Sequence, residues 1–161
     1  MDPPLSRPRE SDIIRSVDAF LTADAEADLA AINRLRPGPD AWGFLIGHRR
    51  GPRVLVERLF PAGAGHALPP PAEIDTIDRG FGRKIVGLYA VRPSAAFLKT
   101  AAGPYFYGRL VLDIRPSRRE PVLKLSVVEF ASRIPPSRST TNGRFRLTTV
   151  AVRTAGKGER P

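Results

Sequence analysis

The stretch that decides the fold is residues 84–93, which read Lys-Ile-Val-Gly-Leu-Tyr-Ala-Val-Arg-Pro. Between the cation Lys84 and the pair Arg92-Pro93, the run is almost wholly apolar. A continuous apolar run of this length, bounded by polar and turn residues, is typical of a strand that is buried on both faces. The sequence therefore predicts a central strand over residues 85–91, and the other elements are placed around it.

Helices are predicted on both sides of this strand. Thr22 or Asp24 can cap the first helix, whose residues Leu29, Ile32 and Leu35 share one face, and the run 37–39 (Pro-Gly-Pro) stops it. Short helices are predicted over residues 72–81, with isoleucines facing the core, and from Ser94 to Thr100.

Five further apolar runs of strand length surround the helices, at residues 42–48, 53–60, 107–115, 122–132 and 144–153. The first two are joined by a short Gly-containing connection (49–52), which predicts an antiparallel hairpin. The order of elements predicts an α/β (α+β) domain with a mixed, mostly antiparallel sheet flanked by helices. We expect one domain over residues 11–153, with loose tails at 1–10 and 154–161 that are rich in proline, glycine and charge.

Composition excludes several kinds of site and location. The chain has no cysteine, so disulfides, thiolate zinc sites and cysteine nucleophiles are excluded. No stretch reaches the ~18 consecutive apolar residues of a membrane span, and the start of the chain does not resemble a signal peptide. We therefore expect a cytoplasmic protein without membrane association.

Positive charge is concentrated in the second half of the chain. The net charge is +10, and residues 79–161 hold seventeen bases and four acids. Such asymmetry can mark a surface for nucleic acid or an acidic partner. A bland alternative is codon bias, because Arg outnumbers Lys 22 to 4. The candidate basic surface consists of Lys84, Arg109, Arg115, Arg118, Arg119, Lys124, Arg144 and Arg146.

The aromatic run 105–107 (Tyr-Phe-Tyr) beside Arg109 has the composition of a nucleic-acid surface. The alternative interpretation is the start of a strand packed on the core.

The stretch 84–93 resembles the strand of JAMM/MPN metalloprotease domains that ends in Gly-hydrophobic-Tyr-His-x-His-Pro, and it keeps Gly87, Tyr89 and Pro93. Residues 40–47 (Asp-Ala-Trp-Gly-Phe-Leu-Ile-Gly) resemble another strand of that family, which is followed by a hairpin return ending in Phe-Pro, here residues 60–61. Residues 110–114 and 122–130 resemble the later strands. The resemblance covers roughly residues 13–153 and implies a cytidine-deaminase-like MPN fold.

Active members of this family bind zinc through two histidines and an aspartate, and a glutamate near the metal takes the proton of the fourth ligand, water. The residues at the histidine positions are Ala90 and Arg92. The family's Ser-x-x-Asp spacing reaches Thr100 and Gly103, and the glutamate position holds Asp40. Alanine has no donor atom and arginine is a permanent cation, so the resemblance implies a domain without metal, cofactor or protease activity.

Two alternatives remain open for these positions. Arg92 and Asp40 could form an ion pair that fills the former metal cavity, or Arg92 and Thr100 could bind a carboxylate or phosphate. The two histidines, His48 and His66, do not have a recognisable ligand spacing.

The leading functional hypothesis is therefore a catalytically inactive MPN-like domain that acts as a protein-interaction or scaffold module. The resemblance implies a homo- or heterodimer and partners in a ubiquitin-like pathway. The alternative is nucleic-acid or acidic-partner binding by the basic surface. A third hypothesis is an enzyme with replaced, metal-free chemistry that uses Asp40 or Arg92.

Overall fold

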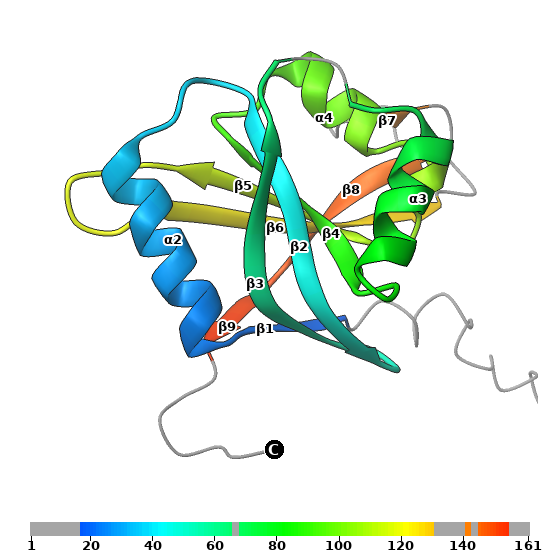
Figure 1. The fold of residues 1–161 in the computed structure, drawn as a ribbon, viewed down its shortest axis with the longest axis horizontal. Coiled ribbons are helices and arrows are strands. Elements are labelled where there is room, and N and C mark those ends of the chain that lie inside the picture. Colours follow the sequence, from blue (N-terminus) through cyan, green and yellow to red (C-terminus); the bar gives the residue numbers. More distant parts are fainter. Residues whose placement is uncertain (1–16, 66–67, 131–140, 143–144, 155–161) are drawn as a thin grey trace, which may run out of the picture.

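The computed structural model describes residues 17–65, 68–130, 141–142 and 145–154, and these contain three α-helices, one 3-10 turn and nine strands (Figure 1). The helices are α2 (Ala23–Leu35), α3 (Pro71–Gly80) and α4 (Ala95–Ala101), and the 3-10 turn η1 spans Pro104–Phe106. The strands are β1 (Asp18–Leu21), β2 (Ala41–Arg50), β3 (Arg53–Gly63), β4 (Ile85–Val91), β5 (Leu110–Arg115), β6 (Val122–Phe130), β7 (Thr141–Asn142), β8 (Phe145–Val150) and β9 (Val152–Thr154).

The described strands form one curled sheet in the order β7-β8-β6-β5-β4-β2-β3-β1-β9. Only β1–β3, β1–β9 and β4–β5 pair in parallel, and the other pairings are antiparallel. In the strand order, β8 lies next to one edge of the sheet and β9 forms the other edge, although only Ala151 separates the two strands in the chain. The sheet is therefore curled so that its two edges approach each other. The prediction of an α+β domain with a mixed, mostly antiparallel sheet is confirmed.

The predicted central strand is β4, which lies between antiparallel β2 and parallel β5. Its close approach to β5 depends on Gly87, because a Cβ there would lie 2.2 Å from the carbonyl oxygen of Leu110. Gly43 of β2 is equally constrained, since its Cβ would lie 2.2 Å from the Phe60 carbonyl oxygen and 2.5 Å from the ring of Tyr89. The glycines that carry the sequence resemblance therefore have a packing role.

Helices cover both faces of the sheet (Figure 1). Helix α2 packs Ala25, Leu29 and Ile32 against one face, in a core that includes residues from β1, β3, β4, β5 and β6. Helices α3 and α4 pack on the other face through Ile74 and Phe97. The molecule therefore has three layers and two apolar clusters, one on each side of the sheet.

The first helix begins where the sequence predicts it. The Thr22 hydroxyl accepts a hydrogen bond from the Ala25 backbone N–H at 3.2 Å, which confirms Thr22 as the N-cap. The prediction that Leu35 shares the buried face of this helix is wrong, because its side chain is 79% exposed. The helix ends at Leu35, and Arg36 turns the chain away with a φ of 46°.

Several predicted bounds are corrected. The strand predicted to start at Tyr107 starts at Leu110, because η1 and Gly108, with a φ of 77°, occupy the preceding segment. The last strand is divided into β8 and β9, and Thr154 belongs to β9 instead of to the predicted C-terminal tail. The N-terminal tail and the rest of the C-terminal tail lie outside the described residues. None of the described helices is long and apolar enough to cross a membrane.

Candidate functional site

Asp40, which the sequence resemblance aligns with a catalytic glutamate, lies just before β2 and is 2% exposed. Its φ of 59° is in the left-handed region, which Asp tolerates better than most residues. Its carboxylate accepts a hydrogen bond from the Ser94 backbone N–H at 2.6 Å, and its own N–H donates to the Val91 carbonyl at 2.9 Å. Asp40 therefore connects the start of β2 to the turn that follows β4.

Ala90 and Arg92, which the sequence resemblance aligns with two zinc-binding histidines, have opposite environments at the end of β4. Ala90 is fully buried, in the apolar cluster that contains Trp42 and Phe97. Arg92 has an exposed side chain and a φ of 45°, and its backbone N–H donates to the Ile114 carbonyl at 2.9 Å. Within the described residues Arg92 forms no ion pair with Asp40, so the first of the two alternatives for these positions is not observed.

Thr100 and Gly103, which the sequence resemblance aligns with the family's Ser-x-x-Asp motif, form hydrogen bonds within helix α4 and the turn after it. The Thr100 hydroxyl donates to the Ala96 carbonyl at 3.1 Å, and the Gly103 N–H donates to the Thr100 carbonyl at 3.2 Å. Arg92 and Thr100 remain a possible anion site, as expected from the sequence, and the described residues do not test it. Across the same residues, no group of three or more His, Cys, Asp or Glu side chains could hold a metal ion.

Of the two histidines, the structure describes His48. His48 lies at the end of β2, with its Nδ1 3.1 Å from Glu57 Oε1 on β3. His66 lies outside the described residues.

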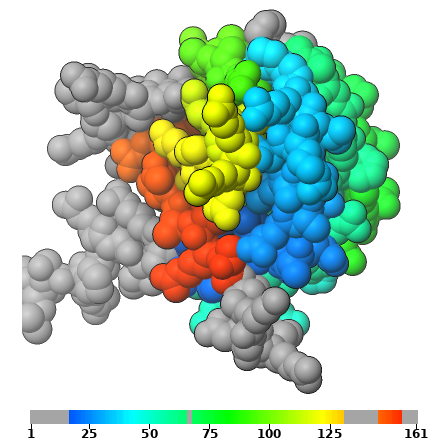
Figure 2. Space-filling model, turned by 90° about the vertical axis from the view of Figure 1, so that its left-hand side faces the viewer, coloured from blue at the N-terminus to red at the C-terminus, as the bar shows by residue number. Residues whose placement is uncertain are grey.

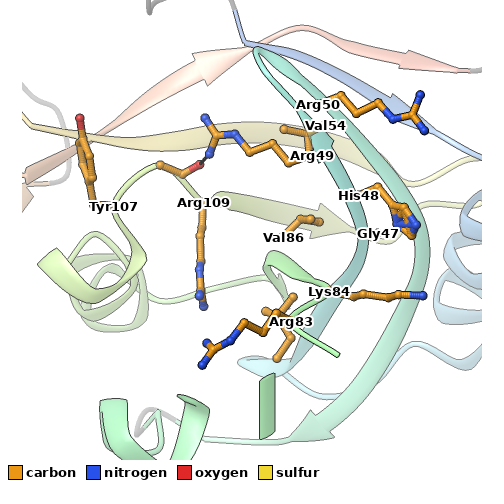
Figure 3. A pocket seen from close by; sticks show the side chains of 12 residues that line it. Gly47, His48, Arg49, Arg50, Val54, Arg83, Lys84, Val86, Tyr107 and Arg109 are labelled. Atoms are coloured by element: carbon orange, nitrogen blue, oxygen red, sulfur yellow. Dashed lines mark hydrogen bonds between the residues drawn. The ribbon is translucent and has the colours of Figure 1, made fainter. Parts of the chain in front are cut away.

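A pocket of about 510 Å³ lies at the other end of β4 (Figure 3). Because β4 has seven residues, its two ends lie roughly 20 Å apart, with the pocket at one end and Ala90 and Arg92 at the other. Asp40, Arg92 and Thr100 do not line this pocket. The walls come from the β2–β3 hairpin, the start of β4 and the segment before β5, and they consist of Gly47, His48, Arg49, Arg50, Val54, Arg83, Lys84, Ile85, Val86, Tyr107, Gly108 and Arg109.

The sheet register brings these three segments together. The end of β2 pairs with the start of β4 through Ile46 and Ile85, and the Gly47 N–H donates to the Lys84 carbonyl at 2.9 Å. The following residues of β4 pair in parallel with β5, which begins just after Arg109. Cations at three separate places in the sequence therefore become neighbours around one cavity.

Two guanidinium groups of the pocket are held by one buried carboxylate. Asp78 of α3 is 3% exposed, and its Oδ1 accepts a hydrogen bond from the Ile85 N–H at 3.0 Å. Its Oδ2 lies 3.4 Å from Arg109 Nη2 and 4.0 Å from Arg83 Nη1. Arg83 also lies 3.3 Å from Asp75. The carboxylates of α3 therefore fix the positions of two of the pocket's cations.

A third guanidinium crosses the pocket from the hairpin. Arg49 donates from Nη1 to the Gly108 carbonyl at 2.7 Å and from Nε to the Gly51 carbonyl at 3.3 Å. Both acceptors are neutral, so the positive charge of Arg49 is positioned without being cancelled. Figure 3 shows Arg49 reaching toward the segment that carries Tyr107 and Arg109, whereas Lys84 and His48 extend to the opposite side.

The predicted basic surface divides between the two ends of β5. Lys84 and Arg109 line the pocket. Arg146 of β8 lies 3.8 Å from Glu129, and Arg144 lies outside the described residues. The remaining residues lie on the β5–β6 hairpin, which packs beside α2 in Figure 2, and they are Arg115, Arg118, Arg119 and Lys124.

Sequence reasoning missed Arg49, Arg50 and Arg83 as partners of Lys84 and Arg109. The available signal was the hairpin: its turn contains the pair Arg49-Arg50, and its second strand is followed by a helix that returns the chain to β4. The sequence does not show that β2 and β4 pair with these ends adjacent, so the cluster could not be assembled from it.

Comparisons with known proteins extend the fold assignment only. No family model matches the chain, and no curated protein matches it. Among solved structures, the chain is similar to the solution structure of protein DSY2949 from Desulfitobacterium hafniense, with a TM-score of 0.55 and 19% sequence identity. The match covers 86% of this chain and 95% of that chain. The similarity therefore extends over nearly the whole of both chains, and at this identity it shows a shared fold.

Proposed function

We propose that this protein is a catalytically inactive, MPN-like domain that works as a protein-interaction module. The observation that carries the proposal is that one position of a zinc ligand and the position of the catalytic glutamate in the resembled family are used for packing here. Ala90 is fully buried in an apolar cluster, and the buried Asp40 carboxylate accepts a hydrogen bond from the Ser94 backbone.

This arrangement is unsuited to hydrolytic zinc chemistry. A catalytic zinc ion needs three protein ligands around one open coordination position. Ala90 offers a methyl group in a close-packed core, and Arg92 offers a cation exposed to solvent. Gly103, at the position of the ligand aspartate, has no side chain, and the Asp40 carboxylate, at the glutamate position, accepts a hydrogen bond from the Ser94 backbone at 2.6 Å. A metal-free enzyme using Asp40 or Arg92 is also less well supported, because neither residue lines the described pocket.

Exposed aromatic residues offer a surface for a protein partner. Phe130 at the end of β6 is 49% exposed, and its ring centroid lies 5.5 Å from that of Phe145 on the adjacent β8. Aromatic side chains are enriched at protein–protein interfaces, where each buries a large area. The proposed interface is therefore the β6–β8 side of the sheet, with a second copy or another MPN-like domain as the partner.

The proposal is tested by measuring assembly. The molar mass of the full chain is determined by light scattering across a wide concentration range, alone and in an extract of its native cell. We expect a dimer or a stable complex that is weakened by Phe130→Ser and unchanged by Leu35→Ser, which alters an exposed apolar residue on α2. A monomer under all conditions, with no partner recovered, would contradict the proposal. The ubiquitin-like class of partner and the cytoplasmic location remain predictions.

A further inference from the structure

We infer that the pocket between the β2–β3 hairpin and the starts of β4 and β5 binds a small phosphate-bearing molecule of the nucleotide class. This site lies at the opposite end of β4 from Ala90 and Arg92, so the inference goes beyond the interaction role proposed above.

The charge of the pocket selects anions. Five permanent cations line it and no carboxylate does; the cations are Arg49, Arg50, Arg83, Lys84 and Arg109. The acids that reach these cations are Asp75 and Asp78. Figure 3 shows the side chains of Arg50 and Lys84 extending away from those of Arg49, Arg83 and Arg109, so the surplus charge rests on these three guanidinium groups against two carboxylates.

The guanidinium groups are held in place before any ligand arrives. Asp78 lies within 4.0 Å of both Arg83 and Arg109, and the carbonyl of Gly108 accepts from Arg49. Planar guanidinium groups present paired N–H donors that match phosphate oxygens, which makes arginine the preferred residue for phosphate recognition. Because their positions are fixed by neighbours, less conformational entropy is lost on binding.

Unused hydrogen-bonding capacity lies next to these groups. Among the described residues, the buried Arg109 Nη1 has no hydrogen-bond partner, and neither has the buried Tyr105 hydroxyl. The Arg109 guanidinium lies 5.1 Å from the centroid of the Tyr105 ring, a cation–π distance that orients it. A buried donor without an acceptor is unfavourable, so an oxyanion or a water that it holds would improve this environment.

An exposed aromatic ring at the rim points to a planar group attached to the phosphate. Tyr107 lines the pocket and is 57% exposed. Its ring centroid lies 6.2 Å from that of Phe145. Bases stack on such rings with little sequence preference. The pocket's volume, about 510 Å³, is within the range of ~300–1,000 Å³ that is usual for small-molecule sites.

The distribution of the other cations favours a small molecule over a nucleic-acid strand. A groove that follows a strand needs cations along its length. Here Arg115 lies 3.5 Å from Asp113 and Arg146 lies 3.8 Å from Glu129, so both already have acidic neighbours. The exposed cations Arg118 and Arg119 belong to the β5–β6 hairpin at the far end of β5. The positive charge is therefore concentrated at the pocket and does not continue along a groove, which favours a small ligand.

The inference is tested by calorimetric titration of the full chain with ADP, pyrophosphate, adenosine and a single-stranded oligonucleotide, each at low and at moderate salt. The pocket variant is Arg49→Gln with Arg83→Gln. The matched control is Arg118→Gln with Arg119→Gln, which removes the same charge from exposed arginines on the distant hairpin. Circular dichroism and thermal unfolding confirm that both variants fold.

We expect ADP to bind the native chain at one site, and the pocket variant to bind it at least about 10-fold more weakly, since each charge-assisted hydrogen bond contributes about that factor. The control variant should stay within about 2-fold, because its cations lie outside the pocket. Tyr107→Leu should weaken ADP but not pyrophosphate.

Other results would overturn the inference. These are no binding of ADP or pyrophosphate by the native chain, equal losses in the pocket and control variants, or tight binding of the oligonucleotide alone. Equal effects of Tyr107→Leu on ADP and pyrophosphate would refute the nucleotide class.

Discussion

The buried carboxylate of Asp78 gives the sharpest prediction about stability. It accepts a hydrogen bond from the Ile85 N–H at 3.0 Å and lies 3.4 Å from Arg109, whose side chain is 24% exposed. Replacement by alanine would leave the N–H without an acceptor and the partly buried guanidinium without its counter-charge. Each hydrogen bond to a charged group contributes about 1.5–3 kcal/mol. Partial solvation of Arg109 lowers its share. We therefore expect Asp78→Ala to lower the free energy of unfolding by about 3 kcal/mol.

A second variant separates the contribution of the Ile85 hydrogen bond from that of the carboxylate's charge. Asp78→Asn keeps a side-chain oxygen for the Ile85 N–H and removes only the charge, so we expect a loss of about 1–2 kcal/mol. Asp75 of the same helix is the matched control. It pairs with Arg79 at 2.6 Å and with Arg83, and both arginines are largely exposed. Surface ion pairs contribute about 0–1 kcal/mol, so Asp75→Asn should have little effect.

The assay is urea denaturation of the three variants and the native chain, followed by circular dichroism, with thermal unfolding as a second measurement. A loss of about 3 kcal/mol corresponds to a decrease in Tm of roughly 6–12 °C for a domain of this size. If Asp78→Ala and Asp75→Asn destabilise the protein equally, the carboxylate of Asp78 does not anchor the start of β4 or the pocket cations, and the reasoning is refuted.

Three further predictions concern the sheet, the first helix and a buried tyrosine. Gly87→Ala should prevent normal folding or cost more than about 3 kcal/mol in urea denaturation, because its Cβ would lie 2.2 Å from the Leu110 carbonyl oxygen. Gly38→Ala, where no atom lies within 4 Å, should be nearly neutral, and equal costs at the two glycines would contradict the strand packing. Thr22→Ala removes the N-cap of α2 and should lower stability by about 1 kcal/mol; an unchanged midpoint of thermal unfolding would argue against the cap. Burial raises the pKa of Tyr89 from 10.0 to about 12, so this phenol stays protonated in the folded state while it ionises in the unfolded chain. Stability should therefore be constant below pH 10 with respect to this group and fall as the pH rises from 10 toward 12. The fall should be smaller in Tyr89→Phe, and equal slopes for the two proteins would show that the buried phenol is not its source.

The fold could largely be predicted from the sequence because its strongest signals are local. The apolar run that forms β4, the cap at Thr22 and the Gly-containing hairpin each depend on neighbouring residues, and all three are observed. The boundaries fail where tertiary context decides. Leu35 follows the helical period but lies at the helix end, and Tyr107 belongs to an apolar run but precedes β5.

The pocket could not be predicted for the same reason. Arg49 and Arg83 line the same pocket because β2 pairs with β4 in a register that places the hairpin turn beside the start of β4. Charge composition identified Lys84 and Arg109, but it gave them equal weight with Arg118 and Arg119, which lie at the other end of β5. The ion pair between Asp40 and Arg92 is one of two alternatives that the sequence resemblance leaves open. It is not observed because Arg92, with a φ of 45°, has its side chain exposed to solvent, whereas Asp40 is buried.

The most direct test of the central claim is the zinc content of the purified full chain, measured by elemental analysis after incubation with zinc and removal of the free ion. With a methyl group and a solvent-exposed guanidinium at the two positions that the proposed MPN-like relationship aligns with histidines, we expect no stoichiometric zinc and no change on adding a chelator. One zinc ion per chain, removed by a chelator together with a peptide-bond cleavage activity, would contradict the account.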